Sequence, residues 1–182
     1  MHVEAFDGAI GMLGKEVQQH GLRPLPIEGT LFASTYRSAT ELPGGGPVGT
    51  AMIGLYCQEP RSFSSFHRLP ADEIWHFYDG DPLRLVLLFP DGSSRDIILG
   101  RDAAAGQVVQ AVVPAGTWQG GHVVADGTWA LFGCTMAPGF TSAGFEGAQA
   151  ADLLRRYPDR SADIERLGSP EDATRMDPDF AT

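Results

Sequence analysis

Nine short segments rich in β-branched and aromatic residues follow one another between residues 30 and 135. They are 30–36, 50–57, 62–67, 73–78, 83–89, 96–99, 107–113, 117–124 and 128–135. Turn sequences such as LPGGGPVG, FPDGSS and LGRDAAAG separate them. No segment between consecutive strands is long enough for a crossover helix, which excludes a parallel sheet. We therefore predict an all-β chain with an antiparallel barrel or sandwich.

Helices are expected only at the two ends of the chain. Val3, Phe6, Ile10, Leu13 and Val17 recur at spacings of three and four, which predicts one short helix ending at Gly21. After residue 145 the sequence becomes helical and charged, with Leu153, Leu154, Ile164 and Leu167 as its apolar contacts. The pattern predicts a single domain over residues 1–168 and a frayed tail over 169–182.

Composition narrows the class of partner. Apolar residues make up 43% of the 182 residues, and no apolar run approaches the length of about 18 that a membrane span needs. The N-terminus does not resemble a targeting segment, so we expect a cytoplasmic protein that does not bind membranes. With 23 acidic against 13 basic residues the formal charge is −10, which opposes nucleic-acid binding. Cys57 and Cys134 lie in apolar segments and are expected to be free buried thiols.

The segment SFHRLPADEIWHFYDGDP places His67, Glu73 and His76 within ten residues. It is compatible with a metal site, an acid–base pair or a packed hairpin. Strand alternation predicts Glu73 on one face, with Trp75 and Phe77, and His76 on the other unless a bulge intervenes. A short LPAD turn folds the strand ending at His67 back on the strand beginning at Glu73. The two side chains are therefore expected to lie near each other.

These motifs carry a family resemblance. Glu73 stands seven residues before Gly80, and a PxG turn in VVPAGTWQGG follows downstream. Both features resemble the two motifs of the cupin superfamily. EGTLFASTYRS, the FHR…DEIWHFY hairpin, VVPAGTWQ and CTMAPGF are together similar to a family of small single-domain cupins of largely unassigned function. The resemblance covers residues 5 to 167 and implies a jelly-roll barrel.

The chain departs from the metal-binding cupin pattern at two positions. The pattern implies three histidines and a glutamate, but Leu69 and Gln119 stand where the second and third histidines are expected. Leucine cannot ligate and glutamine is a poor ligand for iron, manganese or zinc, so no cofactor is expected. The alternative is a metal completed by His76 or His122. For His122 to point inward, a bulge at Gly120–Gly121 is needed.

The resemblance implies a pocket for a small polar metabolite. We expect His67 to act as a base with Glu73 as its partner, in epimerase, isomerase, dehydratase or cyclase chemistry. The residues expected to bind substrate are Arg37, Glu28, Trp75, Phe77, Trp118, Gln119 and His122. Each also has a structural interpretation, as a core aromatic, a buried hydrogen-bonded pair or an ion pair. A metal-dependent oxygenase or isomerase and a non-catalytic binding protein remain as alternatives. We expect a homodimer paired through strand 30–36.

Overall fold

The computed structural model describes residues 19–169, 174–177 and 180. It confirms all nine predicted strands and adds two short ones. The strands are β1 (Arg23–Pro24), β2 (Leu31–Arg37), β3 (Thr50–Cys57), β4 (Ser64–Arg68), β5 (Glu73–Gly80), β6 (Leu83–Leu88), β7 (Ser94–Leu99), β8 (Gln110–Val113), β9 (Trp118–Val123), β10 (Trp129–Met136) and β11 (Glu146–Gly147). Most of the predicted N-terminal helix falls on residues 1–18, which lie outside the described residues.

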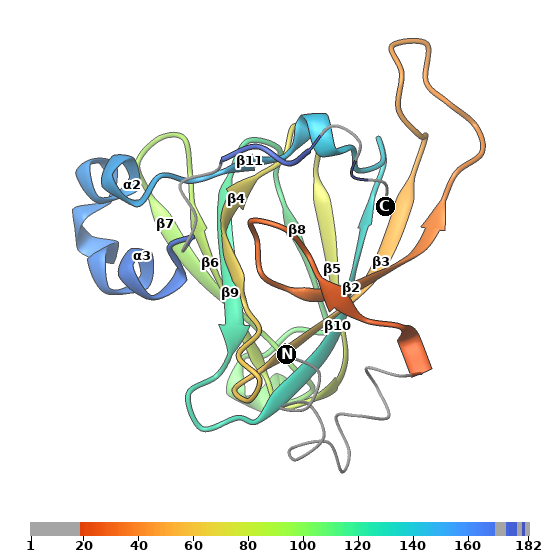
Figure 1. Ribbon diagram of the computed structural model, residues 1–182. Helices are drawn as coiled ribbons and strands as arrows, with labels where there is room; N and C mark the ends of the chain where they lie inside the picture. The colour runs from red at the N-terminus through yellow and green to blue at the C-terminus, as the bar shows by residue number, and fades with distance from the viewer. Residues whose placement is uncertain (1–18, 170–173, 178–179, 181–182) are drawn as a thin grey trace, which may run out of the picture.

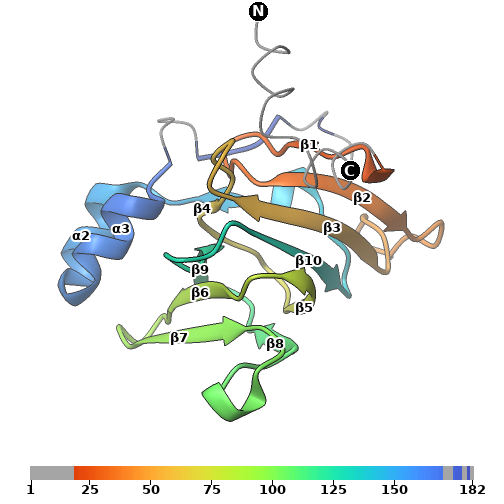
Figure 2. The same cartoon turned by 90° about the horizontal axis from the view of Figure 1, so that it is seen from below.

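The strands form two antiparallel sheets that face each other (Figures 1 and 2). The six-stranded sheet has the order β1-β2-β3-β10-β5-β8, and the five-stranded sheet has the order β11-β4-β9-β6-β7. In each sheet some neighbouring strands are far apart in sequence, as β10 is from β3 and β9 from β4. This order is consistent with the predicted jelly-roll barrel, in which long connections cross between the sheets.

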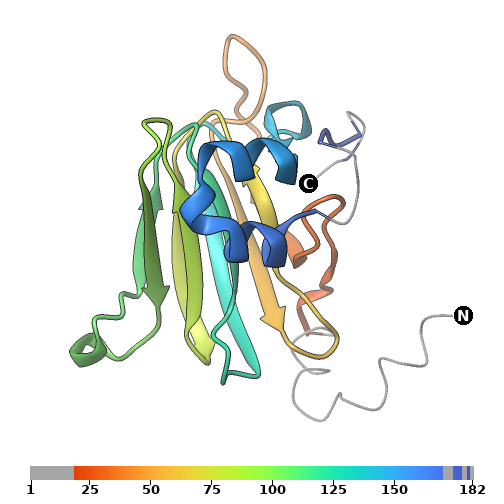
Figure 3. The ribbon, with the colours of Figure 1, turned by 90° about the vertical axis from the view of Figure 1, so that its left-hand side faces the viewer.

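Two short helices, α2 (Ala150–Arg156) and α3 (Ser161–Leu167), cover the outer face of the five-stranded sheet, as Figure 3 shows. Three 3₁₀ helices complete the elements: η2 (Ala103–Ala105), η3 (Ser142–Gly144) and η4 (Pro158–Arg160). Leu153, Ile164 and Leu167 pack on Phe66 and Val86, which confirms the predicted C-terminal helices and most of their contacts. Within the described ranges, no helix is long and apolar enough to cross a membrane.

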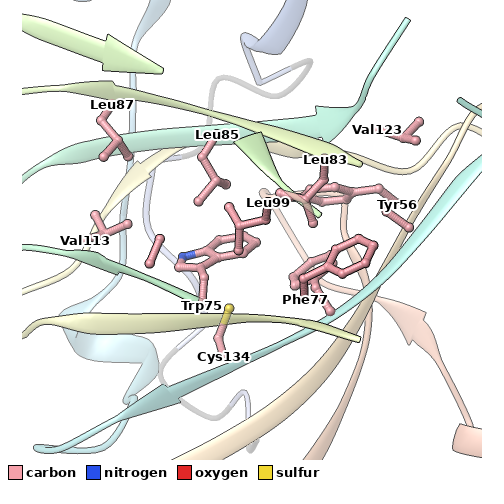
Figure 4. Close-up of a cluster of buried hydrophobic side chains, with 13 residues drawn as sticks. Tyr56, Trp75, Phe77, Leu83, Leu85, Leu87, Leu99, Val113, Val123 and Cys134 are labelled. Atoms are coloured by element: carbon pink, nitrogen blue, oxygen red, sulfur yellow. The ribbon is translucent and has the colours of Figure 1, made fainter. Parts of the chain in front are cut away.

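The inner faces of the two sheets meet in the main core (Figure 4). Leu83, Leu85 and Leu87 of β6 project from one sheet toward Trp75 and Phe77 of the other. Alternate residues of each strand turn inward because successive side chains in a strand point to opposite faces. The core therefore fills one half of the space between the sheets. The other half, near β2 and the start of β5, holds polar groups.

Several of the described C-terminal residues, in the stretch for which a frayed tail is predicted, contact the barrel. The carbonyl of Thr174 accepts a hydrogen bond from the Gly147 amide at 2.8 Å. Met176 is buried beside Leu25 and Phe32, and the Phe180 ring lies 6.0 Å from that of Phe32. Charged and proline-rich composition suggested disorder, but two apolar side chains are enough to dock the segment.

Gly121 of β9 faces the barrel interior at a tight position. A Cβ atom there would lie 2.8 Å from both Leu85 Cδ2 and Tyr56 Oη. We predict that Gly121→Ala lowers the free energy of unfolding by about 1–3 kcal/mol, because a rigid core cannot yield to the added methyl group. Gly44→Ala, where no atom lies within 4 Å, is the matched control and should change it by less than about 0.5 kcal/mol. Urea unfolding curves give the free energy of unfolding of both variants. Equal values for Gly121→Ala and Gly44→Ala would contradict the tight packing around Gly121.

Candidate functional site

A bulge in β4 brings two polar side chains into the barrel. Ser64 pairs with Gly121 and His67 pairs with Gln119, so three steps along β4 match two along β9. Without the extra residue, Ser64 and His67 would lie on opposite faces of the strand. Phe66 between them turns outward and packs under the helices. The bulge therefore builds a polar cluster on the inner face.

His67 is held in one orientation. Its Nδ1 lies 2.9 Å from the Ser65 carbonyl oxygen, and its ring stacks on Phe145 at 5.3 Å between centroids. Because a carbonyl oxygen only accepts, Nδ1 carries the proton of the neutral ring and Nε2 carries the lone pair. Nε2 lies 3.9 Å from Glu28 Oε2, and the whole imidazole is buried. The basic nitrogen therefore faces a carboxylate inside the barrel.

Glu28 comes from the turn between β1 and β2. Its Oε1 accepts hydrogen bonds from Thr30 at 2.5 Å and from Ser64 at 2.6 Å. The Tyr56 hydroxyl extends the network by donating to Ser64 at 2.5 Å. The preceding residue, Ile27, has φ of 69°, a left-handed conformation that is strained for a β-branched side chain. The turn accepts this strain while presenting Glu28 to His67, and such strain is typical of functional sites.

Glu73 lies at the start of β5 and is also buried. Its Oε2 accepts hydrogen bonds from Gln119 Nε2 at 2.7 Å and Trp75 Nε1 at 3.1 Å. Burial raises the pKa of the Glu73 carboxyl above its ordinary value, and although the His67 charge acts in the opposite direction, Glu28 reinforces the rise. Trp75 and Gln119 both donate to Oε2, and the Cys134 thiol is a further hydrogen-bond partner of this carboxyl. Glu73 is therefore a neutral acid over a wider pH range than an exposed glutamate.

A small cavity reaches Glu73 from the side of β2 and β3. It holds about 40 Å³ of free volume, and its lining consists of Leu25, Phe32, Ser34, Thr50, Ala51, Met52, Glu73, Cys134, Met136 and Phe140. The wall is mainly apolar, and Glu73 is its one titratable carboxyl. The buried Cys134 thiol is hydrogen-bonded to Glu73, and burial raises the pKa of that thiol. The two methionines are flexible side chains that can yield to a ligand.

Four of the residues predicted from sequence share the interior with His67 and Glu73. Trp75 and Gln119 bond directly to Glu73, and Phe77 packs in the apolar core rather than at the cavity. Glu28 is the closest carboxylate to His67, which corrects the expectation that Glu73 orients its ring. The ring is oriented instead by the Ser65 carbonyl and by Phe145.

Three other predicted substrate-binding residues lie outside the barrel interior. Arg37 at the end of β2 is exposed and forms an ion pair with Glu41 at 2.8 Å. Trp118 lies on the outer face of β9, with the Arg68 guanidinium over its ring. His122 also faces outward, because the pairing of β9 with β6 is regular and the Gly120–Gly121 bulge does not form.

Sequence reasoning missed Tyr56, Ser64, Thr30 and Cys134, which complete the interior network. Tyr56 and Cys134 sit at inward positions of predicted strands, so strand alternation alone was a usable signal for them. Ser64 has no such signal, because its position depends on the β4 bulge. The Thr30 side chain bonds the Glu28 carboxylate because the turn before β2 brings the two side chains together, and strand alternation does not indicate this turn.

The donor set does not fit the metal that many cupins hold. Leu69 is buried in an apolar cluster with Leu25 and Phe32, so it supplies no ligand. The Gln119 amide is engaged on both sides, by Trp75 and by Glu73. His76 points away from the barrel and bonds Thr135 Oγ1 at 2.9 Å. Among the described residues, no three histidine, cysteine, aspartate or glutamate side chains converge as a metal-ligand group.

The fold and this interior site define a cupin barrel, and comparison with known proteins agrees. Residues 15–148 match the family described as Cupin superfamily (DUF985), and the chain belongs to this family. A search of curated proteins found no match.

Solved structures extend the comparison. The chain is similar to protein SO0799 from Shewanella oneidensis, with 34% identity and a TM-score of 0.78 over 86% of this chain and 97% of that one. A hypothetical protein from Leishmania major has 28% identity and a TM-score of 0.76, over 84% and 96% of the two chains. A cupin 2 conserved barrel domain protein from Rhodopseudomonas palustris, at 13% identity and a TM-score of 0.51 over 80% and 83%, shares the fold alone.

The raised pKa of Glu73 predicts a pH-dependent stability. The pKa of Glu73 is higher in the folded protein than in the unfolded chain. The contribution of protonated Glu73 to the free energy of unfolding is therefore complete below the unfolded-state pKa and is lost as the pH rises through the folded-state pKa. Glu73→Gln cannot ionise, so its advantage over the wild type should grow across that window by about 1.4 kcal/mol per pH unit. Urea unfolding over a pH series measures this. Glu165→Gln on exposed α3 is the control, and a pH-independent difference for Glu73→Gln would contradict the prediction.

Proposed function

We propose that the barrel interior catalyses proton transfer on a small neutral molecule without a metal, in isomerase, epimerase, dehydratase or cyclase chemistry. The observation that carries the proposal is that two groups of opposite role are buried in the same barrel, with Glu73 in the lining of the small cavity and His67 beyond that lining. His67 presents a basic Nε2, and Glu73 is a carboxyl whose pKa is raised by burial. Acid–base catalysis usually relies on two titratable groups whose environments shift their pKa values apart, so that one is protonated while the other is not.

His67 is the proposed base. Its Nδ1–H is fixed on the Ser65 carbonyl, so a substrate proton is taken by Nε2. The imidazolium that forms lies 3.9 Å from Glu28 Oε2, and a carboxylate at that distance stabilises the positive charge in a site that excludes water. Thr30 and Ser64 hold Glu28 through its other oxygen. Glu28 is thus a positioning and electrostatic partner of the base.

Glu73 is the proposed acid. It lines the cavity, and its neutral form can donate from Oε1 to a carbonyl or hydroxyl oxygen of the substrate. Trp75 and Gln119 fix Oε2, so the acidic proton has a defined direction. Proton transfer from a positioned acid and to a positioned base contributes typically 10²–10⁴-fold for each group.

The lining of the cavity indicates the charge of the substrate. Among the described residues that line it there is no lysine or arginine, and both interior carboxyl groups disfavour a second negative charge. The expected arginine anchor, Arg37, is exposed and paired with Glu41. The proposed substrate is therefore neutral, with an apolar part against Met52 and Phe32 and one carbonyl or hydroxyl group toward Glu73.

Replacing His67 tests the proposal without knowledge of the natural substrate. Small neutral hydroxyketones are incubated with the protein in D₂O, and NMR follows solvent deuterium entering the carbon next to the carbonyl. The wild type should accelerate exchange, and His67→Ala should lose about 10²–10⁴-fold of it, because the only basic imidazole in the site is gone. Glu28→Gln should slow exchange less. Carboxylate analogues of the same ketones should exchange poorly.

Three outcomes would overturn the proposal. Deuterium exchange that continues in His67→Ala would show that His67 is not the base. Loss of exchange on treatment with a chelator, with recovery on adding a divalent ion, would favour the metal-dependent alternative. Ketones that bind without exchange, with equal affinity in His67→Ala, would make the barrel a binding module. Circular dichroism of each variant shows that the fold is retained.

We also propose that the chain forms a homodimer through the edge of β2. Strand β1 pairs only with Leu31 and Phe32, and in the described part of the chain residues 33–37 have a neighbour on one side alone. Tyr36 on this edge is 56% exposed. Light scattering at micromolar concentration should give the dimer mass, and Tyr36→Lys should shift it toward the monomer, because lysine blocks edge pairing. A wild-type monomer would contradict the proposal.

A further inference from the structure

His122 has an unpaired nitrogen on the outer side of the five-stranded sheet. Its Nδ1 lies 2.6 Å from the Val123 carbonyl oxygen and donates to it, so Nε2 carries the lone pair of the neutral ring. The side chain is 7% exposed, and Nε2 is buried with no hydrogen-bond partner. An unsatisfied buried acceptor destabilises the folded protein, and a hydrogen-bond donor from a ligand relieves that cost. In the described ranges only the Ser65 hydroxyl shares this condition.

The unpaired nitrogen borders a small pocket between the loop before β4 and the end of α3. We call it the basic pocket, and its lining is Cys57, Gln58, Arg61, Ser62, Phe63, His122, Val123, Arg166 and Leu167. About 20 Å³ of it is free, which is room for one oxygen of a ligand beside His122, so the rest of the ligand lies at the opening to the surface. The pocket lies on the opposite side of the sheet from His67, so it is separate from the proposed catalytic site.

Two positive charges in this pocket lack a carboxylate. The Arg61 guanidinium donates to the Arg166 backbone carbonyl at 3.0 Å and lies over the Phe63 ring. Neither Arg61 nor Arg166 forms an ion pair within 4.0 Å among the described residues. Most arginines elsewhere on this acidic chain do, for example Arg84 with Asp163 and Arg68 with Glu146. Two unneutralised guanidinium groups beside a vacant acceptor suit a ligand that carries both negative charge and a proton.

We propose that the basic pocket binds a protonated oxyanion, namely a phosphate group, either free or at the end of a small ester. The guanidinium groups of Arg61 and Arg166 bond its anionic oxygens, and its remaining O–H donates to His122 Nε2. Arginine matches the planar arrangement of phosphate oxygens. Sulfate has the same shape but keeps no proton at neutral pH, so it cannot satisfy His122.

The charged groups around His122 support the proposal that the shared proton belongs to the ligand and not to His122 Nε2. Burial lowers the pKa of the His122 imidazole, and Arg166 on α3 and Arg84 on β6 act in the same direction. Asp163 on α3 acts against them but is already engaged by Arg84 and Arg160. Arg61 and the Cys57 thiol complete the groups on the loop side. The ring is therefore neutral at pH 7 and requires a donor from the ligand.

Calorimetric titration of the full chain with sodium phosphate and with sodium sulfate, at pH about 7.5 and matched ionic strength, tests the proposal. Phosphate should bind at least tenfold more tightly than sulfate, which is about 1.4 kcal/mol. His122→Leu should remove this preference, since the acceptor is gone while the guanidinium groups remain. At pH about 5.5 sulfate should bind the wild type with uptake of one proton, measured in buffers of different ionisation enthalpy. Phenyl phosphate distinguishes the two sources of phosphate. If it binds more tightly than inorganic phosphate, the site is assigned to a phosphate ester. If it does not bind, the site is assigned to the free phosphate ion.

Two surface variants keep the test independent of folding. Arg166→Gln replaces an exposed side chain and should weaken phosphate binding about tenfold, because a charge-assisted hydrogen bond is lost. Arg95→Gln on β7 removes the same charge away from the pocket and should leave binding within about twofold. Equal weakening of phosphate binding by Arg166→Gln and Arg95→Gln would show only non-specific electrostatic attraction of phosphate to the protein surface. That result, no phosphate binding, or equal affinity for phosphate and sulfate in the wild type would overturn the proposal.

Discussion

Burial of two carboxyl groups and one imidazole in the same barrel is the constraint on which this structure depends. Glu28, Glu73 and His67 are each less than a tenth exposed. Groups of this kind leave water only when hydrogen bonds replace their hydration. Every one of them has such bonds, supplied by Thr30, Ser64, Trp75, Gln119 and the Ser65 carbonyl. Glu28 and Glu73 therefore each anchor a hydrogen-bonded network, in which loss of one partner affects the rest.

The network exists because the strands are not uniform. A regular β4 would turn either Ser64 or His67 out of the barrel, and the bulge keeps both inside. The strained backbone of Ile27 performs a similar task for Glu28. Strand β9 is the contrast, since its regular pairing with β6 leaves His122 outside, under α3. Small backbone irregularities thus decide which histidine belongs to which side of the sheet.

Membership of the cupin superfamily explains the barrel but does not by itself assign a reaction. The interior differs from a metal-binding cupin where ligands are needed, because Leu69 joins an apolar cluster and Gln119 is a hydrogen-bonding amide. In our proposal an acid–base site takes the place of a metal site at these positions. Burial raises the pKa of the Glu73 carboxyl, and the mainly apolar wall of the cavity supports the proposal of a neutral substrate.

The amino-acid sequence by itself determined the nine strands, the antiparallel class, the C-terminal helices and the inward alternation of Glu73, Trp75 and Phe77. These are local properties, set by residue type, turn chemistry and the two-residue period of a strand. Only the tertiary structure decided that Glu28 is the partner of His67, that Arg37 and Trp118 lie away from the cavity, and that the described tail residues pack. Those outcomes depend on bulges, backbone strain and contacts between segments distant in sequence, and none of these leaves a periodic signal.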